Sequence, residues 1–221
     1  MDFYAFVEGP LLWIACLTFI IGSLIRIIFF LAVSSKKDKP FYQYFRWKYV
    51  IATWVKWLLP INKDVAKNPV FAACVYVFHI CLIAVPIWLS GHISLWEQSR
   101  FEWSWKSLPS AWADWMTLVL LAISVYFILR RIISPDLRLI STVSDYLLII
   151  VTALPFLTGY FLTHGTLESI PFFGENMSLL HMLSGELMLI LIPLTRLSHS
   201  ILFFFSRAAT GVEFGRRGYT M

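Results

Sequence analysis

The residues from Val70 to Ile93, VFAACVYVFHICLIAVPIWLSGHI, form an apolar stretch without a single Asp, Glu, Lys or Arg. About 20 apolar residues are enough for a helix to cross the hydrocarbon core of a bilayer. Together with four similar stretches it gives five predicted spans: Leu11–Val33, Val70–Ile93, Trp112–Ile132, Asp145–Leu162 and Leu179–Phe205. The sequence therefore predicts an all-α, multi-pass bundle that forms a single membrane domain over residues 1–221.

The composition agrees with a protein whose main solvent is lipid. Hydrophobic residues make up 59% of the chain and charged residues 14%, and the mean hydropathy is +0.73. The net charge of +5 comes from basic residues in loops between apolar runs, so nucleic-acid binding is not expected. The three cysteines lie in apolar stretches without a CxxC pair, which argues against disulfides, thiolate metal sites and covalent c-type haem.

The distribution of Lys and Arg predicts the orientation, because cytoplasmic loops near the spans retain positive charge. Eight basic residues follow the first span, and further ones follow the third and fifth spans, whereas the opposite side carries only Arg100 and Lys106. We therefore expect the N-terminus outside and the C-terminus in the cytoplasm.

The connection after the first span includes Phe41–Leu59, which mixes aromatic residues with Arg46, Lys48 and Lys56. This mixture favours a helix lying in the headgroup layer. A loop that only carries topogenic charge is the competing interpretation.

Four of the five histidines lie in the second and fifth predicted spans: His79, His92, His181 and His199. Ionisable residues inside a span are costly and usually face the bundle interior for a functional reason. Two neutral imidazoles on facing helices can hold one haem iron as axial ligands. Interhelical hydrogen bonds are the alternative role, and for a single histidine they would be favoured.

The spacing of these histidines suggests two sites at different depths. His181 and His199 are eighteen residues apart, which is five helical turns, so a regular helix would carry both on one face roughly 27 Å apart. His79 and His92 are thirteen residues apart, which corresponds to about 20 Å along a helix. This spacing leaves the two rings off a common face, unless a kink at Pro86 changes the direction of one ring. Antiparallel spans would then pair His79 with His199 near the cytoplasm and His92 with His181 near the outer face.

Three further residues are candidates for contact with haem. Gly91 and Gly185 would let a flat macrocycle approach the backbone, although Gly185 could equally serve close helix packing. Arg196 could pair with a haem propionate, or it could be a snorkelling residue. His164 follows the fourth span and is interpreted as a solvated loop residue outside the ligand set.

At these residues the chain resembles the gamma subunit of respiratory nitrate reductase and related dihaem cytochrome b membrane subunits of five helices. The shared patterns, in order along the chain, are IIGSLIR at Ile20–Arg26, FH with GH at 78–79 and 91–92, ISPDLRLISTVSD at Ile133–Asp145, and H…G…PLTRLSH at His181–His199. The enlarged loop before the second span is more similar to the cytochrome b subunits of sulfate reducers' transmembrane redox complexes. The stretch Leu108–Met116 has no lysine where the nitrate reductase subunit has one near its quinol.

The resemblance implies a subunit of the bacterial or archaeal cytoplasmic membrane that carries two haem b groups. His92 with His181 would hold the outer haem, and His79 with His199 the inner one. Expected partners are other membrane subunits, a cytoplasmic iron–sulfur protein and a periplasmic multihaem cytochrome c, with menaquinone or ubiquinone as the electron carrier in the membrane. Having no soluble catalytic domain, the chain would contribute to an oxidoreductase complex rather than act alone.

Two other functions remain open. A haem-free anchor or assembly subunit would use its histidines for hydrogen bonds between helices. A small transporter would line a proton path with acids such as Glu186 and Asp145, although neither an inverted repeat nor a pair of interrupted helices is visible in the sequence.

Overall fold

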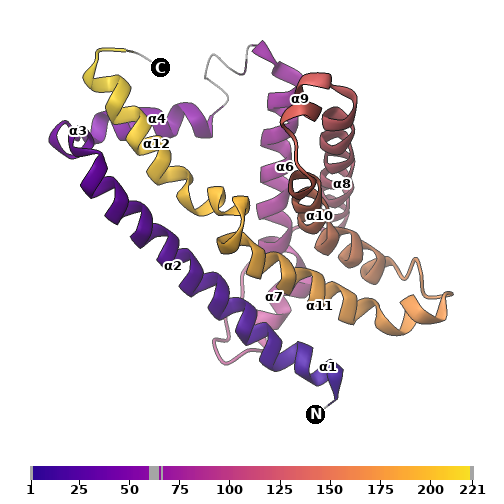
Figure 1. The fold of residues 1–221 in the computed structure, drawn as a ribbon. Helices are drawn as coiled ribbons and strands as arrows, with labels where there is room; N and C mark the ends of the chain where they lie inside the picture. The colour runs from indigo at the N-terminus through magenta and orange to yellow at the C-terminus, as the bar shows by residue number, and fades with distance from the viewer. Residues whose placement is uncertain (1, 60–64, 66, 220–221) are drawn as a thin grey trace. The chain divides into compact units, whose positions relative to one another are not determined.

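The computed structural model describes residues 2–59, 65 and 67–219, and regular secondary structure within them is helical (Figure 1). Five helical stretches in this part of the chain are long and apolar enough to cross a membrane. They are Phe3–Lys37, which joins α1 (Phe3–Phe6), η1 (Val7–Leu11) and α2 (Leu12–Lys37), then α6 (Pro69–Trp88), α8 (Ser110–Ile133), α10 (Val143–His164) and α11 (Pro171–Leu194). The prediction of an all-α protein with five membrane helices is confirmed.

The chain divides into two compact units, one of residues 1–72 with 186–221 and one of residues 73–185. Both boundaries fall inside helices, the first in α6 and the second in α11. The sequence predicted one membrane domain, and the two units are described separately below.

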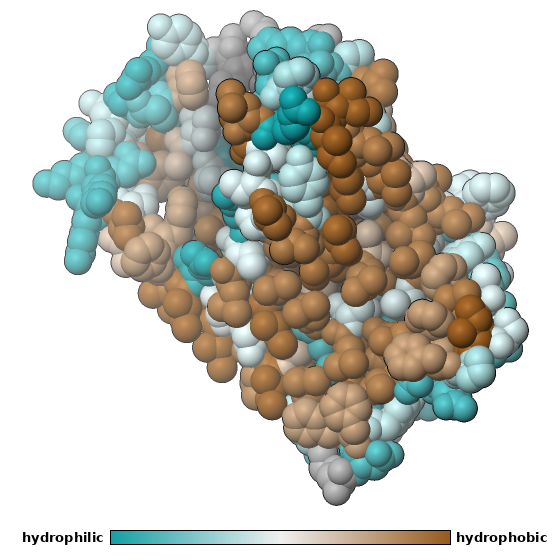
Figure 2. Space-filling model, turned by 45° about the vertical axis from the view of Figure 1, so that its right-hand side comes forward, coloured by the Kyte–Doolittle hydropathy of each residue, from teal (hydrophilic) through white to brown (hydrophobic). Residues whose placement is uncertain are grey.

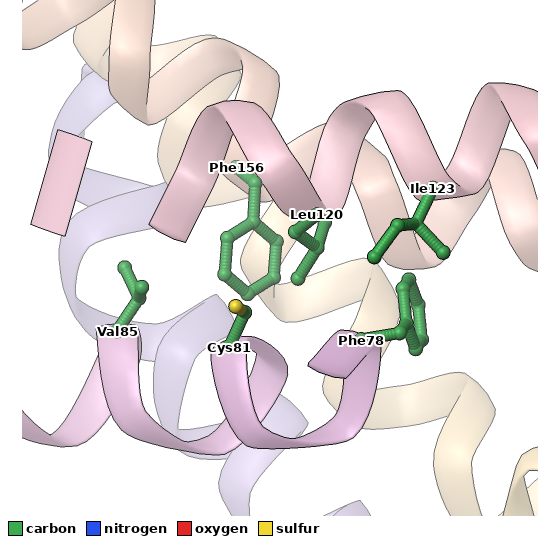
Figure 3. Close-up of a cluster of buried hydrophobic side chains, with 6 residues drawn as sticks. All are labelled: Phe78, Cys81, Val85, Leu120, Ile123 and Phe156. Carbon is green, nitrogen blue, oxygen red and sulfur yellow. The ribbon is translucent and has the colours of Figure 1, made fainter. Parts of the chain in front are cut away.

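In the unit of residues 73–185, α6, α8 and α10 share a hydrophobic core (Figure 3). Its buried members are Phe78, Cys81 and Val85 of α6, Leu120 and Ile123 of α8, and Phe156 of α10. Cys81 is 4% exposed and packs among these apolar side chains. This core holds α6 and α10, which supply the backbone carbonyls that lie beside the candidate-site histidines.

The ISPDLRLISTVSD pattern forms the connection between α8 and α10. It contains the short helix α9 (Pro135–Ile140) and the start of α10, where Thr142 and Asp145 form a capping box. The Thr142 amide donates to the Asp145 carboxylate at 2.8 Å, which satisfies a backbone group that the helix leaves unpaired. At the other end, Gly165 closes α10 in the left-handed conformation, with φ +59°. This stretch of sequence therefore has a structural role in joining α8 to α10.

The second span is shorter than predicted. Helix α6 ends at Trp88, Leu89 is extended with ψ 131°, and a separate helix α7 (Ser90–Glu97) follows. His92 therefore lies on α7, and the expectation of one helix kinked at Pro86 but continuous to Ile93 is wrong. A proline removes a backbone donor three residues before the break, which weakens the end of α6.

The fifth span also ends earlier than predicted, at Leu194 rather than Phe205. Thr195 is extended, residues Arg196–Ser198 form a 3₁₀ turn (η2), and α12 (His199–Arg216) begins a new helix. The argument that five regular turns separate His181 from His199 therefore fails. Pro193 and the extended Thr195 interrupt the ladder of backbone hydrogen bonds that a continuous helix needs.

In the unit of residues 1–72 and 186–221, α12 packs along α4 (Trp47–Leu58), and the short helix α3 (Lys39–Gln43) precedes α4. Val50 of α4 lies in a buried cluster with Ala208 and Val212 of α12. The Trp54 indole donates to the Phe204 carbonyl at 2.9 Å. The segment predicted as an interfacial helix is thus largely helical, and its location in the headgroup layer stays a prediction.

Large apolar side chains are exposed along the spans, and hydrophobic residues dominate the face in Figure 2. On α4 the exposed apolar residues Trp47, Ile51, Val55 and Leu58 recur at helical spacing on one face. Such surfaces suit lipid rather than water.

Candidate functional site

His92 and His181 lie together in the unit of residues 73–185. Their ring centroids are 6.0 Å apart, and the ring planes are within 11° of parallel. An iron ion bound by two imidazoles needs two metal–nitrogen bonds of about 2 Å, and each ring centre lies about 1 Å beyond its nitrogen, roughly 6 Å in all. The distance between the ring centroids thus equals the length of such an axial pair, whereas the direction of the two Nε2 atoms toward one metal stays a prediction. The sequence predicted this pairing from topology.

His92 is held by the broken end of α6. Its Nδ1 lies 2.9 Å from the Pro86 carbonyl oxygen, which would accept a hydrogen bond from an Nδ1–H tautomer. The next two carbonyls of the same helix end are also bonded, since the Trp105 indole donates to Ile87 and the Leu108 amide to Trp88, each at 2.9 Å. The loop of residues 98–109, called the Trp-rich loop because it carries Trp103 and Trp105, thus caps α6, a role that sequence reasoning missed.

His181 is oriented by α10. Its Nδ1 lies 3.1 Å from the Pro155 carbonyl and 3.2 Å from the Thr158 hydroxyl, which also lies 3.1 Å from the Ser184 hydroxyl. Gly159 provides the space for the ring, because a Cβ there would lie 3.0 Å from His181 Cε1. Sequence reasoning missed these α10 residues, although their sequence signal is a Thr-Gly pair in an otherwise apolar span.

His79 and His199 lie in different units, and each is described by its own surroundings. His79 Nδ1 is 2.7 Å from the Val75 carbonyl one turn earlier in α6. His199 is the first residue of α12, and its Nδ1 is 3.0 Å from the Arg196 carbonyl. Their pairing on one metal stays a prediction.

All four histidines therefore share one arrangement, with Nδ1 beside a backbone carbonyl. Metal-binding histidines commonly donate one ring N–H to such a partner, which fixes the tautomer and presents the lone pair of the other nitrogen. A proton on Nδ1 would leave the lone pair on Nε2, and ligation of a metal through Nε2 stays a prediction. In the described ranges no three His, Cys, Asp or Glu side chains converge as a metal-ion cluster, whereas axial ligation needs only two imidazoles.

Gly91 and Gly185 differ from Gly159. Among the residues that the structure describes, a Cβ at either position would meet no atom within 4 Å. Both positions thus have space for at least a methyl group, and the contact of either glycine with a flat macrocycle stays a prediction. Arg196 is exposed and supplies the carbonyl beside His199, while the pairing of its guanidinium with a propionate stays a prediction.

Two other ionisable groups lie outside the histidine set. His164 Nε2 is 3.2 Å from Asp114 Oδ1, and its ring is tilted by 42° to that of Tyr160 with the centroids 4.3 Å apart, so the partly exposed His164 also has side-chain partners. Glu186 on α11 is 4% exposed, and its Oε2 has no hydrogen-bond partner within the described part of the chain. A bare carboxylate is costly inside a membrane, so Glu186 is the residue that the proton-path alternative would use.

The chain was compared with known proteins by sequence and by structure. A protein of Nitratidesulfovibrio vulgaris (strain Hildenborough), described only as "Protein", is 33% identical over 221 aligned residues, which cover 97% of this chain and 95% of the relative. The two proteins belong to one family. No known family profile matches the chain, and no solved structure matches it significantly. Because the match runs nearly end to end, the family includes both units and the connections between their helices.

Proposed function

We propose that this chain is a membrane electron-transfer subunit that carries two b-type haems. The single observation behind this proposal is the His92–His181 pair, whose near-parallel rings are 6.0 Å apart. Both rings have Nδ1 beside a carbonyl, from Pro86 and from Pro155. The contacts of His181 with Pro155 and Thr158 of α10 are bonds between helices that a haem-free anchor would also make, so haem content is the measurement that separates the two functions.

The chain's own residues would position and insulate the cofactors. Each haem supplies an iron that gains and loses one electron. The carbonyls beside Nδ1 would fix the tautomer of each ligand, and Gly91 and Gly185 leave room for a macrocycle. The apolar helices would exclude water, which favours electron transfer over side reactions.

In this proposal His92 and His181 hold the outer haem, and His79 and His199 the inner one. Electrons would pass between the quinone pool or a periplasmic multihaem cytochrome c and a cytoplasmic iron–sulfur partner. Menaquinone or ubiquinone would react near His92, beside the Trp-rich loop that caps α6. The N-terminus would lie outside and the C-terminus in the cytoplasm of a bacterial or archaeal membrane.

The test is haem content with paired substitutions. Wild-type protein purified in detergent is expected to contain two haems per chain and a b-type band in the reduced-minus-oxidised spectrum. His92→Ala and His181→Ala should each remove the same haem, and His79→Ala and His199→Ala should each remove the other. His164→Ala is the matched control and should retain both.

Two outcomes would contradict the proposal. A wild-type protein without a b-type band would point to the haem-free anchor or assembly subunit instead. If His92→Ala and His181→Ala deplete spectroscopically different haems, the assignment of this pair to one iron is wrong.

A further inference from the structure

Two sequence patterns that are far apart along the chain meet in the unit of residues 1–72 and 186–221. They are IIGSLIR of α2 and PLTRLSH, which runs from the last residues of α11 to the first residue of α12. Gly22 lies directly against the buried Pro193, because a Cβ at Gly22 would be 2.8 Å from Pro193 Cβ. One turn later on the same face of α2, the Arg26 side chain reaches the end of α11.

The break after α11 leaves two backbone carbonyls without their usual helical donors. In a continuous helix the amides of residues 197 and 198 would bond to the carbonyls of Pro193 and Leu194. Here the Leu197 amide bonds to the Thr195 hydroxyl at 3.2 Å, and the Ser198 amide to the Thr195 carbonyl at 3.2 Å. A backbone carbonyl without a hydrogen-bond donor in a membrane-spanning segment raises the free energy of the folded state.

Arg26 supplies the missing donors. Its Nε donates to the Pro193 carbonyl at 2.7 Å, and its Nη2 donates to the Leu194 carbonyl at 3.4 Å. Hydrogen bonds from a charged donor are the stronger kind, and the planar guanidinium can bridge two acceptors at once. Arg26 therefore stabilises the broken form of this segment over a continuous helix, in which both carbonyls would be satisfied internally.

The direction of the His199 side chain depends on this break. His199 begins α12 five residues after Leu194, and its Nδ1 lies beside the carbonyl of Arg196 within the 3₁₀ turn. A continuous helix would move that carbonyl and rotate the imidazole. We propose that Arg26 is a positioning residue for His199, acting through the carbonyls of Pro193 and Leu194, an inference that rests on the proposed role of His199 as a haem ligand.

The experiment uses the full-length chain in detergent and compares four variants. Arg26→Ala removes both donors, Arg26→Lys keeps one flexible charged donor, and Gly22→Ala displaces Pro193 while leaving Arg26. Ser23→Ala is the control on the same helix, since the Ser23 hydroxyl donates to the Phe19 carbonyl of its own helix. The readouts are haem per chain, the reduction potential of each haem, and the electron paramagnetic resonance signal of each oxidised haem, which reports the angle between the axial imidazole planes.

Arg26→Ala is expected to lower haem content from two per chain to one, with loss of the same haem that His199→Ala removes. Arg26→Lys should restore the second haem with a shifted resonance signal, and Gly22→Ala should shift the signal of that haem alone. Ser23→Ala should match the wild type. Gly159→Ala, which crowds His181, should alter only the other haem.

The proposal is overturned if Arg26→Ala keeps two haems with unchanged signals. It is equally overturned if Arg26→Ala, Arg26→Lys and Gly22→Ala all lose both haems together, because that result indicates a general role in folding. A wild-type protein that binds no haem contradicts the proposed function itself. Failure of the proposed function is therefore seen in the wild type, whereas failure of the Arg26 proposal is seen only in the variants.

Discussion

At the scale of single residues, the four histidines share a contact that defines their chemistry. Each has Nδ1 beside a backbone carbonyl, from Val75, Pro86, Pro155 or Arg196. A neutral imidazole that donates from Nδ1 presents Nε2 as a base or metal ligand. The carbonyls of Pro86 and Arg196 are placed by helix breaks, so two of these contacts depend on local departures from regular helix.

Glycines beside the histidines have two different roles, and this difference yields a prediction. At Gly159 an added methyl would collide with His181, whereas at Gly185 it would meet no atom within 4 Å in the described residues. Gly185→Ala should therefore leave the haem-free protein at least as stable, since alanine is favoured over glycine in a helix by about 1 kcal/mol. If a macrocycle lies against Gly185, the same change should reduce haem occupancy of the His92–His181 site.

The measurement is thermal unfolding and haem content of Gly185→Ala, prepared with and without added haem. Gly9→Ala is the matched control, because a Cβ at Gly9 also meets no described atom within 4 Å and the residue is far along the chain from any histidine. Full haem occupancy in Gly185→Ala would show that the open space there serves another purpose.

At the scale of secondary-structure elements, the most informative features are where the helices stop. Hydropathy predicted spans ending at Ile93 and Phe205, but α6 ends at Trp88 and α11 at Leu194. The residues after each break are still apolar, so the span end predicted from hydropathy lies beyond the true end of the helix. The break is decided by hydrogen bonding, with loop residues capping α6 and Arg26 capping α11.

The contact between α4 and α12 depends on glycine, which gives a prediction at this scale. A Cβ at Gly211 would overlap the Thr53 hydroxyl, and one at Gly215 would overlap the Tyr49 ring. Gly211→Ala and Gly215→Ala should each separate the helices, at a cost of about 1–3 kcal/mol typical of overpacking. Separation would also remove the Trp54 indole bond to Phe204 and expose the indole.

The checks are the fluorescence emission of the Trp54 indole, in a variant whose other tryptophans are replaced by phenylalanine, and thermal unfolding. Gly211→Ala and Gly215→Ala should shift the emission toward that of an exposed indole and lower the unfolding midpoint. Gly9→Ala serves again as the control. Unchanged emission in both variants would contradict the role of these glycines in helix packing.

At the scale of the whole molecule, the testable property is orientation in the bilayer. Basic residues flank the ends of the spans that we assign to the cytoplasm, and this bias sets topology in most membrane proteins. A reporter enzyme that is active only in the cytoplasm, fused after Met221, should therefore be active. The same reporter fused before the first span should be inactive, and activity of a periplasmic reporter at Met221 would invert the assignment.

The sequence by itself determined the fold class, because the number and length of apolar stretches depend only on composition along the chain. It also identified His92 and His181 as a pair from depth and direction, and the structure brings their rings together. Both inferences need only the residue types along the sequence and the length that a bilayer requires of a helix.

Only the tertiary structure determined the orientation of the candidate-site side chains. The break at Leu89, the loop that caps α6, the space at Gly159 and the reach of Arg26 to Pro193 all involve partners distant in sequence. A helix end is stable in lipid only where some other group bonds its last carbonyls, and residues 18 to 168 positions away supply those bonds here. No local pattern contains that information, because each partner becomes a neighbour only once the helices have packed.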